Sequence, residues 1–96
     1  MSEISVKIIA MSELSTYLGW RERIHPTKSQ TIRGILSEIA QNDGKFRELV
    51  YNPTNGRFSE WVVILINGID MKQRNGLDTP VFNNTEIECF YPFEGG

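Results

Sequence analysis

The feature that most restricts the fold is an amphipathic segment over residues 31–41. A helix here places five apolar side chains on one continuous face: Ile32, Ile35, Leu36, Ile39 and Ala40. Thr31 is suited to cap the first turn, and Gly44 is suited to end the helix. Further apolar residues at positions 46, 49 and 50 indicate one more helical turn. The stripe must be covered by another apolar surface if the chain is to fold.

Short β-like segments on both sides of this helix can supply that surface. Residues 4–8 and 85–91 alternate between apolar and polar side chains, as strands with one buried face do. Residues 61–66 form an apolar run that ends at Asn67-Gly68, a strong hairpin signal. Pro26 makes any strand over residues 21–28 short and places it at an edge. One helix with four or five strands predicts an α+β fold.

The alternation leaves two apolar residues on strand faces that are otherwise polar. Ile9 shares a face with Ser5 and Lys7, and Phe90 shares a face with Glu86 and Glu88. Scattered exposed apolar residues are normal on protein surfaces, but two on one sheet face can mark a partner site. Ile9 and Phe90 are therefore candidate partner-binding residues.

Composition excludes several classes of function. Ten Lys and Arg against twelve Asp and Glu give a net charge of −2, which argues against nucleic-acid binding. One cysteine and one histidine cannot form a disulfide or a zinc site of known spacing. Cys89 is expected to be a small buried residue, and His25 a loop or strand-end histidine without a catalytic role. With no apparent signal peptide or membrane span, the expected location is cytoplasmic.

The chain ends in Gly95-Gly96, which arises by chance in roughly 0.5% of chains. A chance ending or a remnant of cloning is one interpretation. The other is functional, because glycine has no side chain and a Gly-Gly end can thread a narrow channel. Such an end delivers its α-carboxylate to another enzyme, and adenylation makes that group open to attack by sulfide or an amine. This would explain why the chain has no catalytic residues of its own.

Several ordered motifs resemble the small subunit of molybdopterin synthase. They are the first strand over residues 4–10, Thr31-Ile32-Arg33-Gly34-Ile35-Leu36, Ile66-Asn67-Gly68-Ile69-Asp70, Gly76-Leu77-Asp78-Thr79-Pro80-Val81, and the ending Gly95-Gly96. Together they cover nearly the whole chain. The tail departs from the family pattern, because Tyr91 stands where the first of two prolines is usual and Phe93 is bulky.

The resemblance implies one domain over residues 1–96 with a ubiquitin-like β-grasp fold and a flexible tail over residues 92–96. In this fold the first and last strands are central neighbours. It also implies a sulfur carrier that is not catalytic alone, in which Gly96, with Gly95 beside it, becomes an adenylate and then a thiocarboxylate. The family's docking residues fall on Ile9 and Phe90, and Phe93 is a further expected contact.

The implied partners are an adenylyltransferase of the ubiquitin-activating type, which uses ATP, and the large subunit of molybdopterin synthase. No cofactor or metal is expected on the chain itself. Two alternatives stay open. The same tail would serve a ubiquitin-like modifier of protein lysines or a carrier for tRNA thiolation, and the Gly-Gly ending could be incidental in a β-grasp binding module.

Overall fold

The computed structural model describes residues 3–92, which fold into strands and short helices. The elements in chain order are β1 (Ile4–Ala10), α1 (Ser12–Leu18), β2 (Glu22–Thr27), α2 (Ile32–Asn42), α3 (Gly44–Leu49), β3 (Tyr51–Asn52), β4 (Arg57–Phe58), β5 (Val63–Ile66), β6 (Ile69–Asp70), the 3-10 helices η1 (Met71–Gln73) and η2 (Gly76–Asp78), and β7 (Glu86–Phe90). None of the helices in this part of the chain is both long and apolar enough to cross a membrane.

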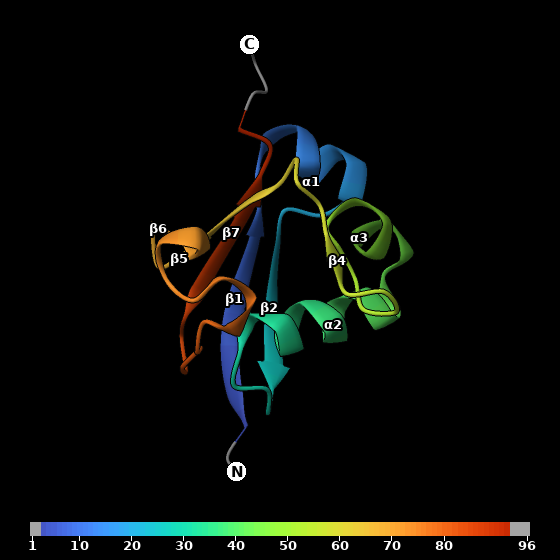
Figure 1. Cartoon of the computed structure of the whole chain (residues 1–96). Helices are drawn as coiled ribbons and strands as arrows, with labels where there is room; N and C mark the ends of the chain where they lie inside the picture. The colour runs from blue at the N-terminus through green and yellow to red at the C-terminus, as the bar shows by residue number, and fades with distance from the viewer. Residues whose placement is uncertain (1–2, 93–96) are drawn as a thin grey trace.

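The main sheet has five strands in the order β2-β1-β7-β5-β6. β1 and β7 pair in parallel from Lys7↔Glu86 to Ala10↔Cys89, so the first and last strands are central neighbours. β2 and β5 flank this pair in antiparallel orientation. Figure 1 shows α1, α2 and α3 on one side of the sheet, with β7 running beside β1. This arrangement confirms the α+β prediction and the ubiquitin-like β-grasp fold.

The core lies between α2 and the inner face of the sheet. All five residues of the predicted helix stripe are buried, and Ile8 and Ile87, paired on neighbouring strands, are fully buried beneath them. Helix α2 begins where predicted, because the Thr31 hydroxyl accepts a hydrogen bond of 3.3 Å from the Gly34 amide. The apolar stripe and the alternating strands therefore fix the main packing of the molecule.

The prediction that Gly44 ends this helix is wrong. Asp43 has an extended backbone and separates α2 from α3, and Gly44 is the first residue of α3. The Asp43 carboxylate accepts a hydrogen bond of 3.1 Å from the Phe46 amide and so caps α3. Gly44 does not end a helix, because the Asp43 cap just before it starts a new one.

Strand lengths in the second half also differ from prediction. The apolar run begins to pair only at Val63, and the return strand ends at Asp70. The Asp70 carboxylate then accepts a 2.9 Å hydrogen bond from the Lys72 amide, which starts η1. A small second sheet pairs β3 with β4 on either side of residues 53–56, and these two-residue strands are too short for periodicity to detect.

A polar network ties the edge strand β2 to α2. The Glu38 carboxylate accepts hydrogen bonds from Thr27 Oγ1 at 2.7 Å and Ser29 Oγ at 2.6 Å, and it pairs with His25 Nε2 at 2.7 Å. Burial alone raises the pKa of Glu38, but the hydrogen bonds from Ser29, His25 and Thr27 outweigh it and lower that pKa. His25 therefore lies in a strand with a structural partner on the neighbouring helix.

Gly34 allows this network to form. A Cβ atom at position 34 would lie 2.7 Å from Ser29 Oγ and 2.8 Å from Ser29 Cβ, closer than non-bonded atoms approach. The glycine that weakens the propensity of α2 thus lets the segment after β2 lie against the helix.

Candidate partner-binding surface and carrier tail

The outward face of the sheet, opposite the helices, carries the candidate docking residues. On β1, Lys7 and Ile9 point outward while their neighbours are buried, and on β7 Glu86, Glu88 and Phe90 do the same. Paired residues on adjacent strands point to the same side, and Ile9 pairs with Glu88. The structure therefore brings Ile9 and Phe90 to one face, as the alternation predicted.

The two residues are not direct cross-strand partners. Phe90 lies opposite Val63 on β5, two residues further along β7 than the Glu88 that faces Ile9. Both side chains are half-buried rather than fully exposed. Ile9 and Phe90 are thus diagonal neighbours on the outward face of the sheet.

Further apolar residues on this face were missed by the sequence analysis. Val63 and Leu65 are half-buried on β5, and on β2 Ile24 is 63% exposed and pairs with Lys7. In residues 61–66 both strand faces are apolar, so alternation gave no sign of which side faced outward. We call Ile9, Ile24, Val63, Leu65 and Phe90 the outer apolar patch.

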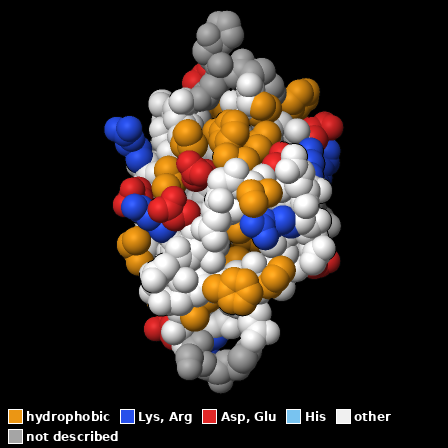
Figure 2. All heavy atoms as spheres, turned by 90° about the vertical axis from the view of Figure 1, so that its left-hand side faces the viewer, with side chains coloured by type: hydrophobic (Ala, Val, Ile, Leu, Met, Phe, Trp, Pro, Cys, Tyr) orange, Lys and Arg blue, Asp and Glu red, His pale blue; other side chains and the backbone are white. Residues whose placement is uncertain are grey.

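Charged side chains, mostly acidic, lie within and around the outer apolar patch, and Glu88 lies between Ile9 and Leu65 because it pairs with both. Glu86 and Glu88 come from β7, and Glu22 on β2 forms an ion pair of 3.7 Å with Lys7. Figure 2 shows several groups of hydrophobic side chains on this side of the molecule, with both acidic and basic side chains beside them. Such a surface suits a partner that offers an apolar centre and a basic rim.

The C-terminal tail begins where β7 ends. Phe90 is the last residue of the strand, and Tyr91 and Pro92 follow as the last described residues. The predicted site residues Phe93, Gly95 and Gly96 lie outside the described residues. Because Phe90 belongs both to β7 and to the outer apolar patch, the patch lies close to the start of the tail.

Cys89 is not an accessible thiol. Its side chain is fully buried on the inner face, and burial, with a smaller contribution from the charge of Glu88, raises the pKa of the thiol to about 12. A thiol is nucleophilic as its thiolate, which is scarce at neutral pH with such a pKa. The prediction that Cys89 is a small buried core residue is confirmed.

Solved structures with the same fold belong to several small proteins. Small archaeal modifier protein 1 from Methanosarcina acetivorans is 19% identical, with a TM-score of 0.79 and 100% of both chains covered. The protein assigned as molybdopterin converting factor, subunit 1, from Pyrococcus furiosus is 20% identical, with a TM-score of 0.69, and the match covers 93% of this chain and 98% of that chain. These likenesses establish the fold.

A chain in the BexX/CysO complex of Amycolatopsis orientalis is 15% identical, with a TM-score of 0.72, and the match covers 95% of this chain and 99% of that one. A search of curated proteins found no match.

A family model settles the relationship at the level of sequence. The model of the ThiS family matches residues 8–96, which include the end of β1, the other four strands of the main sheet and the Gly-Gly ending. The match therefore covers both the scaffold described above and the tail that follows it. The chain belongs to the ThiS family, a family of ubiquitin-like sulfur carriers.

Proposed function

We propose that this protein carries sulfur on its C-terminal glycine, as a thiocarboxylate of Gly96, and delivers it in molybdopterin synthesis. The observation that carries the proposal is the family match over residues 8–96, which includes the Gly-Gly ending, separated by four residues from the central strand β7. The outer apolar patch beside this strand supports it, because a carrier without catalytic residues must dock onto the enzymes that act on its tail.

The chemistry needs only the terminal carboxylate from this chain. The Gly96 carboxylate attacks the α-phosphorus of ATP on a partner adenylyltransferase, which forms the acyl adenylate and releases pyrophosphate. A sulfur nucleophile then attacks the acyl carbon and AMP leaves, which gives the thiocarboxylate. The thiocarboxylate sulfur then bonds to a carbon of a pterin precursor in the large subunit. Water cleaves the acyl–sulfur bond, which leaves the sulfur on the pterin and regenerates the Gly96 carboxylate. Gly95 contributes by its size, because a side chain there would obstruct a narrow channel.

The buried state of Cys89 supports placing the sulfur on the tail. A carrier that used a thiol would need it accessible and deprotonated, whereas this thiol is fully buried with a raised pKa. The terminal carboxylate is the group that a partner could reach by threading the tail.

Protein modification is a second candidate function. The observation that favours it is the likeness to small archaeal modifier protein 1 over 100% of both chains. A modifier would use the same adenylate, but a lysine amine of a target protein would attack it and form an isopeptide bond. Any lysine-linked product therefore separates the two functions.

The proposal is tested by incubating the full chain with its adenylyltransferase, ATP and sulfide, and measuring intact mass. We expect the wild-type protein to exchange one oxygen for sulfur. Deletion of Gly96 should abolish the exchange with almost no change in thermal stability, because a terminal tail makes few packing contacts. Replacement of Gly95 by leucine should impair the same steps by obstructing the channel.

Phe82→Ala is a matched control for this assay. Phe82 is 69% exposed and precedes β7, at the opposite end of that strand from the tail. This variant should load sulfur as the wild type does. Sulfur loading of the protein that lacks Gly96 would overturn the proposed mechanism.

A further inference from the structure

The start of the tail has a side-chain contact that the sulfur chemistry does not require. The rings of Tyr17 on α1 and Tyr91 meet edge to face, with centroids 6.2 Å apart. Aromatic pairs favour this geometry at such distances. The two rings, with Lys45, Glu48 and Leu49 of α3, line a groove of about 240 Å³. We call the Tyr17–Tyr91 pair the aromatic clasp.

The aromatic clasp includes Tyr91, the first residue after β7. The paired residues of β7 reach Cys89 on the β1 side and Phe90 on the β5 side, so Tyr91 lies just past the last of them. Pro92 then restricts the backbone of Tyr91 to extended conformations, because the proline ring disfavours the helical region for the preceding residue. The ring contact and the proline together favour one direction for the chain as it leaves β7.

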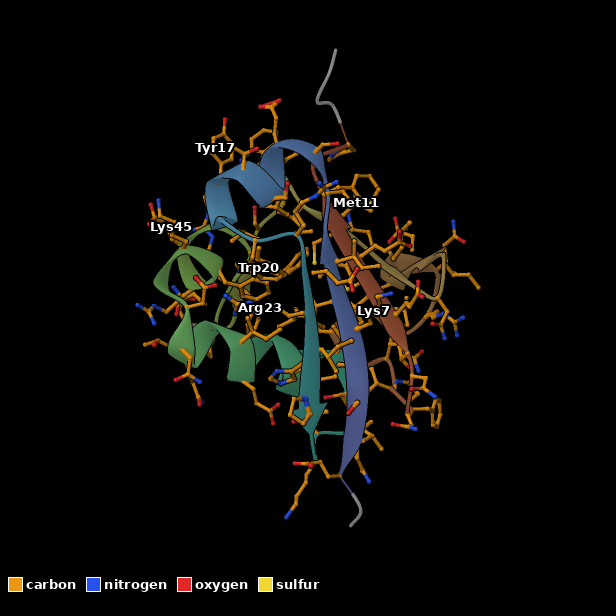
Figure 3. The ribbon with its side chains drawn as sticks, turned by 180° about the vertical axis from the view of Figure 1, so that it is seen from behind. Lys7, Met11, Tyr17, Trp20, Arg23 and Lys45 are labelled. Carbon is orange, nitrogen blue, oxygen red and sulfur yellow. The ribbon has the colours of Figure 1, made fainter. Side chains whose placement is uncertain are left out.

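Tyr17, the other residue of the aromatic clasp, belongs to α1, a helix that is packed against the core. Leu14 and Leu18 of α1 are buried in the core, which holds this short helix in place. Tyr17 is 50% exposed, so it is not needed to fill the core. Figure 3 shows Tyr17 on α1 at the same end of the molecule as the end of β7, with Lys45 nearby. A half-exposed tyrosine on a fixed helix is well placed to orient the tail.

We propose that the aromatic clasp is a positioning device for the tail, with Tyr17 as a positioning residue. It holds Tyr91 against α1, so that the terminal glycine leaves the molecule in a set direction relative to the outer apolar patch. Four residues follow Pro92, which span at most about 14 Å. A short tail with a fixed origin reaches the partner's site with less ordering on binding. This inference rests on the proposed function.

The first measurement uses backbone ¹⁵N relaxation to follow the Tyr91 amide at the start of the tail. In the wild type we expect the Tyr91 amide to be rigid, with an order parameter near about 0.85. In Tyr17→Ala it should fall below about 0.6, while the Phe90 amide keeps its wild-type value. Tyr17→Phe keeps the ring and loses only the hydroxyl, which lies 3.4 Å from Glu13 Oε2. This variant should match the wild type.

The second measurement is the rate of adenylate formation with the activating enzyme and ATP. Tyr17→Ala should lower kcat/KM about tenfold, Tyr17→Phe should restore it, and both variants should unfold at the wild-type denaturant midpoint. An ordered Tyr91 amide or a wild-type rate in Tyr17→Ala would overturn the positioning role. If the wild-type protein forms no adenylate at all, the proposed function fails, and the relaxation data still decide whether the clasp orders the tail.

Discussion

The two faces of the central strands use similar residues for different purposes. On the inner face, Ile8 and Ile87 lie side by side and are fully buried beneath α2. On the outer face, Ile9 and Phe90 lie on the same two strands, yet both stay half-buried. Inner residues of a strand are thus fully buried in the free protein, whereas outer residues of the same strand remain partly exposed.

This difference separates stability from recognition. An inner side chain is surrounded in the free protein, so truncating it leaves a cavity. An outer side chain can gain burial only when something else docks on it. The outer apolar patch is therefore expected to affect partner binding more than folding, and the inner face the reverse.

The largest effect on stability is expected from Ile87→Ala. The truncation leaves a cavity under α2, and such substitutions lower the free energy of unfolding by about 2–5 kcal/mol. Urea denaturation measures this loss. Ile9→Ala is the matched control on the paired strand, and its loss should be clearly smaller. Equal losses at the two positions would show that the two faces do not differ in this way.

Phe90→Ala should weaken partner binding more than folding, the reverse of what we expect for Ile87→Ala. A desolvated aromatic at an interface is worth about 2 kcal/mol or more, so binding to the activating enzyme or the large subunit should weaken by roughly 30-fold or more. Because Phe90 is half-buried beside Val63, unfolding should cost less than the roughly 3–5 kcal/mol of a core phenylalanine. Titration calorimetry and urea denaturation give the two values. A variant that unfolds readily but binds normally when folded would place Phe90 with the core.

Cys89→Ser places a polar atom on the inner face with only a small loss of volume. A buried hydroxyl that finds no hydrogen-bond partner costs about 1–3 kcal/mol, which denaturation should detect. Sulfur loading should continue, because the proposed carrier group is the terminal carboxylate. Loss of sulfur loading in a fully folded Cys89→Ser protein would contradict the proposal and indicate that the Cys89 thiol carries the sulfur.

The smallest effect is expected from the acidic border of the outer face. Glu88→Gln removes a charge beside Ile9 and should weaken partner binding about two- to fivefold, as single exposed charges do. Added salt should weaken wild-type binding in the same direction, since it screens the attraction to a basic rim. Affinity measured over a range of salt concentrations tests this, and binding that strengthens with salt would contradict the predicted charge of the partner.

Sequence periodicity predicted the inner face well because its cause is local. The stripe on α2 and the alternation in β1 and β7 follow directly from the repeat of a helix and of a strand. The Asn67-Gly68 turn was equally clear, with both residues at positive φ in the structure. These segments predicted the α+β class and the position of the core.

The outer face was only half predictable. Ile9 and Phe90 stood out against polar neighbours, whereas Val63 and Leu65 were hidden in a continuous apolar run. The Glu38 network and the aromatic clasp join residues far apart in sequence, and no periodic pattern reports such contacts. The role of Gly34 likewise depends on Ser29, which approaches it only in the folded chain.

The most direct test of the central claim is the intact mass of this protein isolated from its native host. We predict a form in which one oxygen of the Gly96 carboxyl group is replaced by sulfur, and fragmentation should place the added mass on the last residue. A chain found only with an unmodified terminus, or only in lysine-linked adducts, would contradict the account of this protein as a sulfur carrier.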